Sequence, residues 1–426
     1  MTFMPKFKTP EELARVQLEG LQWTVAHAYG GSPFYRERFE GAGVTPDRIR
    51  SLDDLRRLPF TTAADLREGY PFPLRSVPFR DLVRIHSSSG TTGVRKILGY
   101  TRKDVEDWTH FFARCYQMAG VGPDDRVQIC VGYGLWTAGV SFQAGCEAAG
   151  ALAIPIGPGN LDMQCQFLAD LEPTVICCTA SMALLTAEEV ARRGLRDRVR
   201  LRTVILGSER CSDAMRQRIK ELLGVEHIYD ITGMTELYGP GAGIDCSRHA
   251  GIHYWADYYL LEILDPETLE PVREGEVGEM VVTTLRKEGS PLVRYRTRDL
   301  TRAIPGRCAC GSILPRHDRI LGRSDDMFIF RAVNIYPSTI EKILSRVPGV
   351  GSEFNVVLER EESGKDRMLV RVEREPSVDP AADSGLAAEV VRRIKDEVMV
   401  TADVEVIDYG ALPRSERKSK RVYDNR

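Results

Sequence analysis

The chain has 426 residues, of which 43% are hydrophobic and 28% charged, a composition typical of a globular protein with two or three domains. Its 58 Lys and Arg residues nearly balance 61 Asp and Glu residues, which argues against nucleic acid or an anionic membrane as the main partner. The N-terminal segment lacks the basic-then-apolar pattern of a signal peptide, so we expect a cytoplasmic protein.

The first eighty residues are expected to form helices and loops, with Thr61 or Thr62 capping a helix that begins near Ala63. Four β-branched segments then precede helix-compatible sequence, namely "DRVQICVGYG", "ALAIPIGP", "PTVICCTAS" and "RTVILGSE". This alternation predicts βαβ units and a largely parallel sheet with functional loops at the carboxyl ends of its strands. The long apolar run 127–157 contains Gln143, Glu147 and Pro155, and therefore predicts strand, loop, helix and strand rather than a membrane span.

After Gly239 strands and turns alternate without helical periodicity, which predicts an antiparallel β subdomain over about residues 240–320. The last hundred or so residues have strand–helix–strand content and predict a small α+β domain. The expected fold is therefore α/β, with an N-terminal domain of residues 1–324 that contains parallel βαβ sheets and the antiparallel subdomain. A C-terminal domain of residues 325–426 follows, with the junction near Asp325.

The segment "HSSSGTTGVRK" is too small and polar to build a core. A glycine-rich loop after a strand can present converging backbone N–H groups, and serine and threonine hydroxyls add donors for phosphate oxygens. Lys96 or Arg95 would neutralise charge, although the Walker pattern is absent. A flexible surface loop is the alternative, which the position directly after "LVRIH" disfavours.

Five motifs, in order, resemble those of the adenylate-forming superfamily of acyl-CoA synthetases, luciferases and nonribosomal adenylation domains. They are the phosphate loop "SSSGTTGVRK", the Thr-Glu motif "YDITGMTE", the ribose motif "YRTRD", the hinge motif "LGRSDDMFIFRAVNIYPSTIE" and the lysine-bearing segment "PRSERKSKR". The finer resemblance covers essentially the whole chain and is to the phenylacetate–CoA ligase branch, through segments such as "SPFYRERFEGAGV", "GYGLWTAG" and "YGPG".

The resemblance implies a role for each matching residue. The triphosphate would be surrounded by Ser87, Ser88, Ser89, Gly90, Thr91, Thr92, Gly93 and Lys96. Glu236 would hold Mg²⁺ with Thr235 near the α-phosphate, and Asp299 would bind the ribose hydroxyls with Arg323 beside it. The other nucleotide-binding residues would be Ser208, Glu209, Tyr229, Asp230 and Thr232. Lys418 would be the adenylation lysine, and Asp325 the hinge of a mobile C-terminal domain.

Taken singly, these residues have plainer interpretations: a helix-start carboxylate for Glu236, a surface ion pair for Asp299 and Arg323, and a solvated tail for Lys418. Four positions also depart from the usual motifs. Thr232 stands where a tyrosine is usual in the branch, and Arg298, Ala332 and Arg417 stand where glycine is common. None of these departures removes an essential charge.

The acyl pocket would include Tyr133, Trp136 and Ala138, which suit a flat aromatic acid but could equally be ordinary core residues. Most of the ten cysteines, such as Cys130, Cys177 and Cys178, lie in apolar runs and are expected to be buried.

Three cysteines lie outside the apolar runs and form a second constellation with nearby histidines. Cys246, Cys308 and Cys310 with one histidine could hold a structural Zn²⁺, and the resemblance favours His253 over His249. Free surface thiols beside unrelated histidines are the alternative.

The sequence thus predicts an aryl-CoA ligase that uses ATP and Mg²⁺ to form an acyl adenylate and then a thioester with coenzyme A. One alternative is a synthetase that loads a carrier protein or stops at the nucleotide adduct. Another is a non-catalytic nucleotide sensor, which the intact Glu236, Asp299 and Lys418 disfavour. Relatives in the branch are often dimers, but nothing in the sequence sets the oligomeric state, and neither nucleic acid nor membrane is an expected partner.

Overall fold

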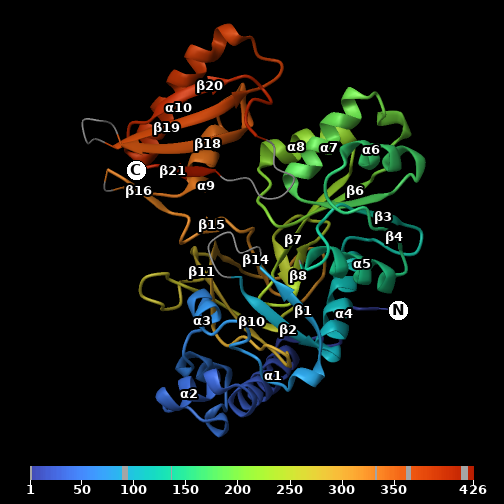
Figure 1. Cartoon of the computed structure of the whole chain (residues 1–426), viewed down its shortest axis with the longest axis vertical. Coiled ribbons are helices and arrows are strands. Elements are labelled where there is room, and N and C mark those ends of the chain that lie inside the picture. The colour runs from blue at the N-terminus through green and yellow to red at the C-terminus, as the bar shows by residue number, and fades with distance from the viewer. Residues whose placement is uncertain (1, 89–94, 136, 332, 361–365, 414–420) are drawn as a thin grey trace.

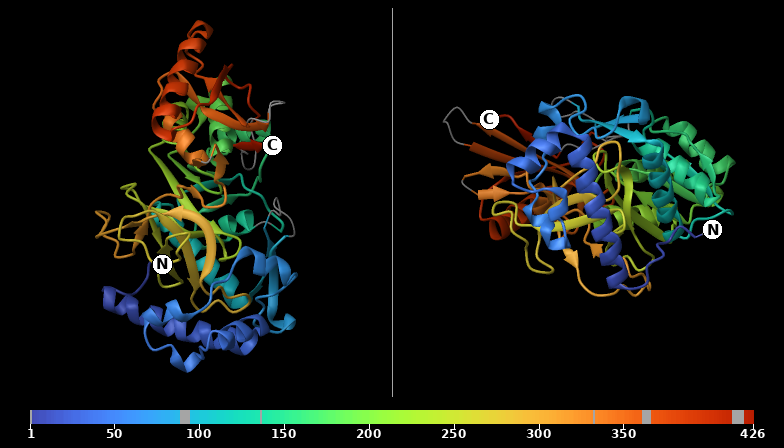
Figure 2. Two further views of the ribbon diagram at one scale, coloured as in Figure 1. Left: turned by 90° about the vertical axis from the view of Figure 1, so that its left-hand side faces the viewer. Right: turned by 90° about the horizontal axis from the view of Figure 1, so that it is seen from below.

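The computed structural model describes residues 2–88, 95–135, 137–331, 333–360, 366–413 and 421–426. The N-terminal helices lie at one end of the molecule and the C-terminal residues at the other, as Figures 1 and 2 show. The first eighty described residues contain three α-helices and no long strand, as expected: α1 (Pro10–Gly31), α2 (Pro33–Gly41) and α3 (Ala63–Glu68). Thr62 caps α3 by accepting a hydrogen bond from the N–H group of Asp65, so the predicted helix start is confirmed.

A nine-stranded sheet forms the centre of the molecule (Figure 1), in the order β13-β14-β9-β8-β7-β6-β5-β3-β4. Four strands of its parallel part come from the segments that the sequence predicts, namely β3 (Arg126–Ile129), β4 (Leu152–Ile154), β5 (Val175–Cys178) and β6 (Thr203–Leu206). The fifth parallel strand, β7 (His227–Met234), was not among those segments. The helices between these strands are α5 (Ala138–Ala149), α6 (Leu161–Asp170), α7 (Ala180–Arg192) and α8 (Asp213–Leu223). Every residue of β5 and β6 is buried, as expected for strands of a sheet that is covered on both faces.

The antiparallel region is less separate than the sequence suggests. Four of its strands extend the central sheet beyond β7, each antiparallel to its neighbour, namely β8 (Gly239–Asp245), β9 (Ile252–Tyr254), β14 (Arg316–His317) and β13 (Ala303–Ile304). The others form a second sheet: β10 (Tyr259–Leu264), β11 (Gly278–Thr284), β12 (Tyr295–Thr301) and β15 (Gly322–Arg323). The cause is a tight hairpin turn after β7, which reverses the chain within the sheet.

A separate hairpin of β1 (Leu82–Ser87) and β2 (Ile97–Thr101) precedes the long helix α4 (Arg102–Met118). α4 makes contacts with β2, β8 and α5, so it joins the hairpin to the central sheet. Thr101 caps the helix with the help of Asp104, whose carboxylate accepts from the Thr101 N–H group.

The C-terminal region has a core of its own, made only of residues from Phe328 onward. Its elements are β16 (Phe328–Phe330), β17 (Val333–Ile335), α9 (Pro337–Leu344), β18 (Val350–Arg360), β19 (Asp366–Arg374), α10 (Asp383–Val398), β20 (Asp403–Ile407) and β21 (Val422–Asp424). This is the α+β content that the sequence predicts. The boundary at Asp325 and the mobility of this region stay predictions.

Among the described residues, no helix combines the length and the apolar character that crossing a membrane requires. The run 127–157 is folded as β3, a loop, α5 and β4, in agreement with its sequence interpretation. Cys130, Cys177 and Cys178 are buried, as expected.

Candidate active site

The β1–β2 hairpin holds both ends of the candidate phosphate loop. The Ser88 N–H group donates to the Lys96 carbonyl oxygen over 3.0 Å, and the Lys96 N–H group donates to Ser88 Oγ over 3.2 Å. Ser87 pairs with Ile97 in the ladder just before these bonds. Five of the predicted loop residues lie outside the described residues, namely Ser89, Gly90, Thr91, Thr92 and Gly93. These bonds hold Ser88 and Lys96 side by side at the end of the β1–β2 hairpin.

Lys96 forms an ion pair with Glu236, whose side chain is 8% exposed. Tyr295 from β12 donates a hydrogen bond to the same carboxylate oxygen, Oε1, over 3.0 Å. Burial alone would raise the pKa of Glu236, but the charge of Lys96 and the hydrogen bonds from Lys96 and Tyr295 lower it overall. Three predicted motifs, far apart in the sequence, thus meet at one ionised carboxylate. Tyr295 belongs to the "YRTRD" motif, but its sequence position alone gave it no role.

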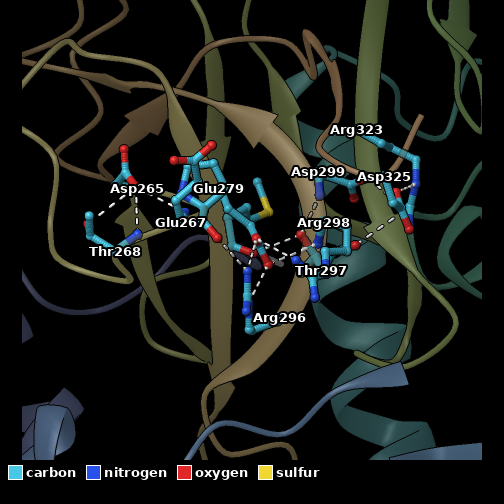
Figure 3. Close-up of polar contacts among 12 residues, drawn as sticks. Asp265, Glu267, Thr268, Glu279, Arg296, Thr297, Arg298, Asp299, Arg323 and Asp325 are labelled. Carbon is cyan, nitrogen blue, oxygen red and sulfur yellow. Dashed lines mark hydrogen bonds and ion pairs between the residues drawn. The ribbon is translucent and has the colours of Figure 1, made fainter. Parts of the chain in front are cut away.

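The predicted ribose residue, its neighbouring cation and the predicted hinge are connected by ion pairs (Figure 3). Arg323 Nη1 donates to Asp299 Oδ1 over 3.0 Å, and Arg323 Nε and Nη2 donate to the two carboxylate oxygens of Asp325 over 2.8 and 2.9 Å. Asp299 and Arg323 also face each other in the β12–β15 ladder. One guanidinium therefore joins Asp299 on β12 to Asp325, which precedes the first strand of the C-terminal region.

Arg298, where the superfamily commonly has glycine, has a left-handed backbone with φ of 68°. Its N–H group lies 3.4 Å from the carboxylate of Glu279, a fully buried residue that also accepts two hydrogen bonds from Arg296 over 3.0 and 2.7 Å. Figure 3 shows this carboxylate between the two arginines. The pairing between β11 and β12 is irregular here, so the substitution of arginine for the usual glycine lies at a distorted part of the strand. Asp299 still pairs with Arg323 on β15.

Several other predicted nucleotide residues are engaged with protein groups. Glu209 Oε1 accepts from the Ser181 N–H group over 2.5 Å, and Asp230 pairs with Arg216 over 2.6 Å and with Arg319 over 3.2 Å. Ser208 has φ of 72°, the Tyr229 ring packs against His227 and His249, and Thr232 pairs with Gly243. Tyr229 and Asp230 thus face partners other than the Lys96–Glu236 pair.

The predicted acyl-pocket segment lies against the phosphate hairpin, since the Ser87 N–H group donates to the Leu135 carbonyl oxygen over 2.9 Å. Tyr133 packs over Gly139, at which a Cβ atom would lie 2.5 Å from the Tyr133 ring. Burial raises the pKa of Tyr133 to about 12, and its hydroxyl has no hydrogen-bond partner among the described residues. Ala138 is the first residue of α5. Trp136 and the predicted catalytic Lys418 lie outside the described residues.

The structure brings together the four predicted zinc ligands, whose donor atoms all lie within 4.8 Å of one another: Cys246, His253, Cys308 and Cys310. His253 Nδ1 lies 3.1 Å from the Leu314 carbonyl oxygen and Nε2 lies 3.5 Å from Cys310 Sγ. Burial lowers the pKa of His253 to about 4, which keeps the imidazole neutral. His249 contacts Asp245 and His227 instead. The donor set and the orientation of His253 therefore fit a closed tetrahedral metal site.

One ion pair joins the loop after β6 to the C-terminal region. Arg210 Nη1 lies 3.1 Å from Glu341 Oε2 on α9. Burial raises the pKa of Glu341, and the charges of Arg210 and Arg421 only partly oppose this effect. The pair therefore forms a direct contact between the N-terminal and C-terminal regions.

The model of the AMP-binding enzyme family matches residues 42–285, and that of the AMP-binding enzyme C-terminal domain matches residues 332–426. The chain belongs to the AMP-binding enzyme family. Phenylacetate-coenzyme A ligase of Escherichia coli is 39% identical over 98% of this chain and 95% of its own length. The enzyme of the same name from Thermus thermophilus is 39% identical over the full length of both chains.

Among solved structures, a 2-hydroxyisobutyryl-CoA ligase in the postadenylation state with R3-HIB-AMP superposes with a TM-score of 0.89 at 29% identity, covering 99% of this chain and 94% of that chain. The same ligase in the thioesterification state, with 2-HIB-AMP and CoA, gives a TM-score of 0.71 at 30% identity, covering 98% and 90%. The arrangement of the present chain therefore matches the postadenylation form of that ligase better than its thioesterification form.

Proposed function

We propose that the chain is an AMP-forming aryl-CoA ligase that acts on phenylacetate or a closely similar aromatic acid. A carboxylate oxygen of the acid attacks the α-phosphorus of ATP and pyrophosphate leaves, giving the acyl adenylate. The thiol of coenzyme A then attacks the acyl carbonyl and AMP leaves. The observation that carries the proposal is the buried Lys96–Glu236 ion pair at the phosphate hairpin, in a chain whose full-length relatives are phenylacetate–CoA ligases.

The proposed roles follow from charge. Lys96 and the loop that it closes would bind the triphosphate, Asp299 would accept from the ribose hydroxyls, and Arg323 would lie beside it. Glu236 would hold Mg²⁺, which neutralises charge on the leaving pyrophosphate. Tyr133 and Ala138, next to the hairpin, would contact the acid.

The function is tested by acid-dependent AMP release. We expect the purified chain to release AMP with phenylacetate, ATP, magnesium and coenzyme A, and more slowly with benzoate, aminobenzoates or hydroxylated analogues. A phosphopantetheinyl carrier protein should not replace coenzyme A. Release with the carrier alone would indicate a carrier-loading synthetase, and the absence of pyrophosphate exchange with every acid would contradict catalysis.

Lys418 is proposed to neutralise charge between the carboxylate and the α-phosphate. We expect Lys418→Ala to slow acid-dependent pyrophosphate exchange by about 10²- to 10³-fold, the usual effect of removing one group that stabilises a transition-state charge. Lys420→Ala is the matched control and should keep most of the activity. Both variants should still convert synthetic phenylacetyl adenylate and coenzyme A to thioester, and undiminished exchange in Lys418→Ala would refute the assignment.

Cys246, His253, Cys308 and Cys310 are proposed to bind a structural Zn²⁺, because three thiols and one neutral imidazole converge with no other role in the site. We expect Cys308→Ser to lose zinc by metal analysis and to lower the free energy of unfolding by about 4 kcal/mol, as the loss of a structural metal can. His249→Ala should keep its zinc. A zinc-free wild-type protein of unchanged stability would refute the site.

The Arg210–Glu341 pair is proposed to stabilise the arrangement that carries out adenylation. We expect Arg210→Ala or Glu341→Gln to slow pyrophosphate exchange by about threefold, the effect of losing a partly exposed ion pair. Thioester formation from synthetic acyl adenylate should not slow. The charge-reversed double variant should recover exchange, and Arg346→Ala, which removes the Arg346–Glu397 pair within the C-terminal region, is the control. Equal slowing of both half-reactions would contradict the proposal.

A further inference from the structure

Two buried side chains converge on the backbone of the turn that carries Glu236. The turn, residues 235–238, joins β7 to β8. The Tyr100 hydroxyl lies 3.0 Å from the Thr235 carbonyl oxygen and 2.9 Å from that of Tyr238. The Lys287 ammonium donates to the Glu236 carbonyl oxygen over 3.1 Å and to that of Leu237. The four successive carbonyl oxygens of the turn therefore lie within hydrogen-bond distance of these two side chains, and the single hydroxyl proton of Tyr100 is shared between two of them.

Lys287 is fully buried and surrounded by aromatic rings. Its Nζ atom lies 4.9 Å from the centre of the Tyr100 ring and 5.0 Å from that of Tyr238. Burial lowers the pKa of Lys287 to about 8, and the charges of Asp104 and Glu236 limit the decrease. The side chain is therefore mostly protonated near neutral pH, and its protons bond to the turn rather than to water.

The backbone beside Lys287 is also fixed. The N–H groups of the next two residues, Glu288 and Gly289, each donate to the Asp104 carboxylate over 2.8 Å. Asp104 is itself fully buried in the first turn of α4, directly after β2. The ammonium therefore comes from a segment that is held rigidly against the helix following the phosphate hairpin.

We propose that Lys287 and Tyr100 are positioning residues that hold the Glu236 turn in register with the phosphate hairpin, so that the Glu236 carboxylate is placed for nucleotide-bound magnesium. A turn has no ladder to satisfy its carbonyl groups, and a buried carbonyl without a partner is costly, so the turn adopts the conformation that these two donors impose. Tyr100 lies on β2, four residues after Lys96, so its hydroxyl connects the Glu236 turn to the strand that begins next to Lys96. The inference rests on the proposed function through the role of Glu236.

The test compares ATP affinity with and without Mg²⁺ by titration calorimetry, which requires neither the acid nor turnover. The variants are Lys287→Met, which removes the ammonium group but retains a side chain of similar length, and Tyr100→Phe, which keeps the ring but removes the hydroxyl. Lys103→Met is the matched control, because Lys103 donates to the carbonyl of Arg286, the neighbour of Lys287, without contacting the turn. Thermal unfolding measures the structural cost of each change separately.

We expect the affinity for magnesium-free ATP to stay within about twofold in all variants. Magnesium should strengthen binding to the wild type and to Lys103→Met, and most of this gain, about tenfold in affinity, should be lost in Lys287→Met. Tyr100→Phe should lose about threefold, and it carries the test if Lys287→Met does not fold. Glu236→Gln should lose the gain as well, and the double variant Lys287→Met/Glu236→Gln should bind no more weakly than Glu236→Gln alone.

The proposal would be overturned if magnesium still strengthened ATP binding by the wild-type factor in folded Lys287→Met and Tyr100→Phe. It would also be overturned if Lys287→Met/Glu236→Gln bound magnesium-ATP more weakly than Glu236→Gln alone. A wild type without any magnesium gain would overturn it too. Failure of the proposed function can be distinguished from failure of this inference. In that case acid-dependent AMP release would be absent, while the variants would still differ from the wild type in their affinity for magnesium-ATP.

Discussion

An ionised carboxylate inside a protein requires a cation or several donors, and the centre of this structure depends on how Glu236 meets that requirement. Lys96 supplies the cation and Tyr295 a hydrogen-bond donor, both at the same carboxylate oxygen. In the proposed reaction both charges acquire new partners, since a triphosphate attracts Lys96 and magnesium attracts Glu236. The ion pair thus satisfies each group in the absence of nucleotide, and binding exchanges partners rather than uncovering isolated charges.

The second set of charges lies where the N-terminal region meets the C-terminal region. Arg323 is about as exposed as Arg210, at 40% and 37% of the side chain, so each of their ion pairs is screened by water and contributes little to stability. Weak contacts would suit a junction at which the C-terminal region moves, as the proposed hinge at Asp325 requires. The solved 2-hydroxyisobutyryl-CoA ligase structures resemble this chain to different degrees in their two states, with TM-scores of 0.89 and 0.71.

The sequence predicts those parts of the structure that neighbouring residues determine, and it misses those that depend on contacts between distant segments. Runs of β-branched residues locate β3 to β6 correctly, and a cap residue locates the start of α3. The extension of the central sheet was not predicted: β8 and β9 join it through local hairpins, but β14 and β13 join it through the pairing of β14 with β9, about sixty residues apart. Lys287 and Tyr100 were missed for the same reason. Lys287 lies between Arg286 and Glu288 shortly after β11, so nothing in the local sequence distinguishes it from an exposed lysine, and its partners are brought to it only when the turn folds against it.

The cysteine cluster illustrates how distant pairing and local chemistry support each other. β9, β14 and β13 have three, two and two residues, so the outer edge of the central sheet is held by few ladder bonds. Arg316 adds hydrogen bonds to the carbonyl oxygens of Ala250, Pro305 and Gly306, which join the same two loops that carry the cluster. His253 and Arg316 are partners in the ladder, so a metal bound by His253 and the three thiols would fix the register of strands too short to fix it themselves. The proposed zinc therefore acts at the edge of the sheet, away from the Lys96–Glu236 pair, and its contribution is to the fold rather than to the chemistry.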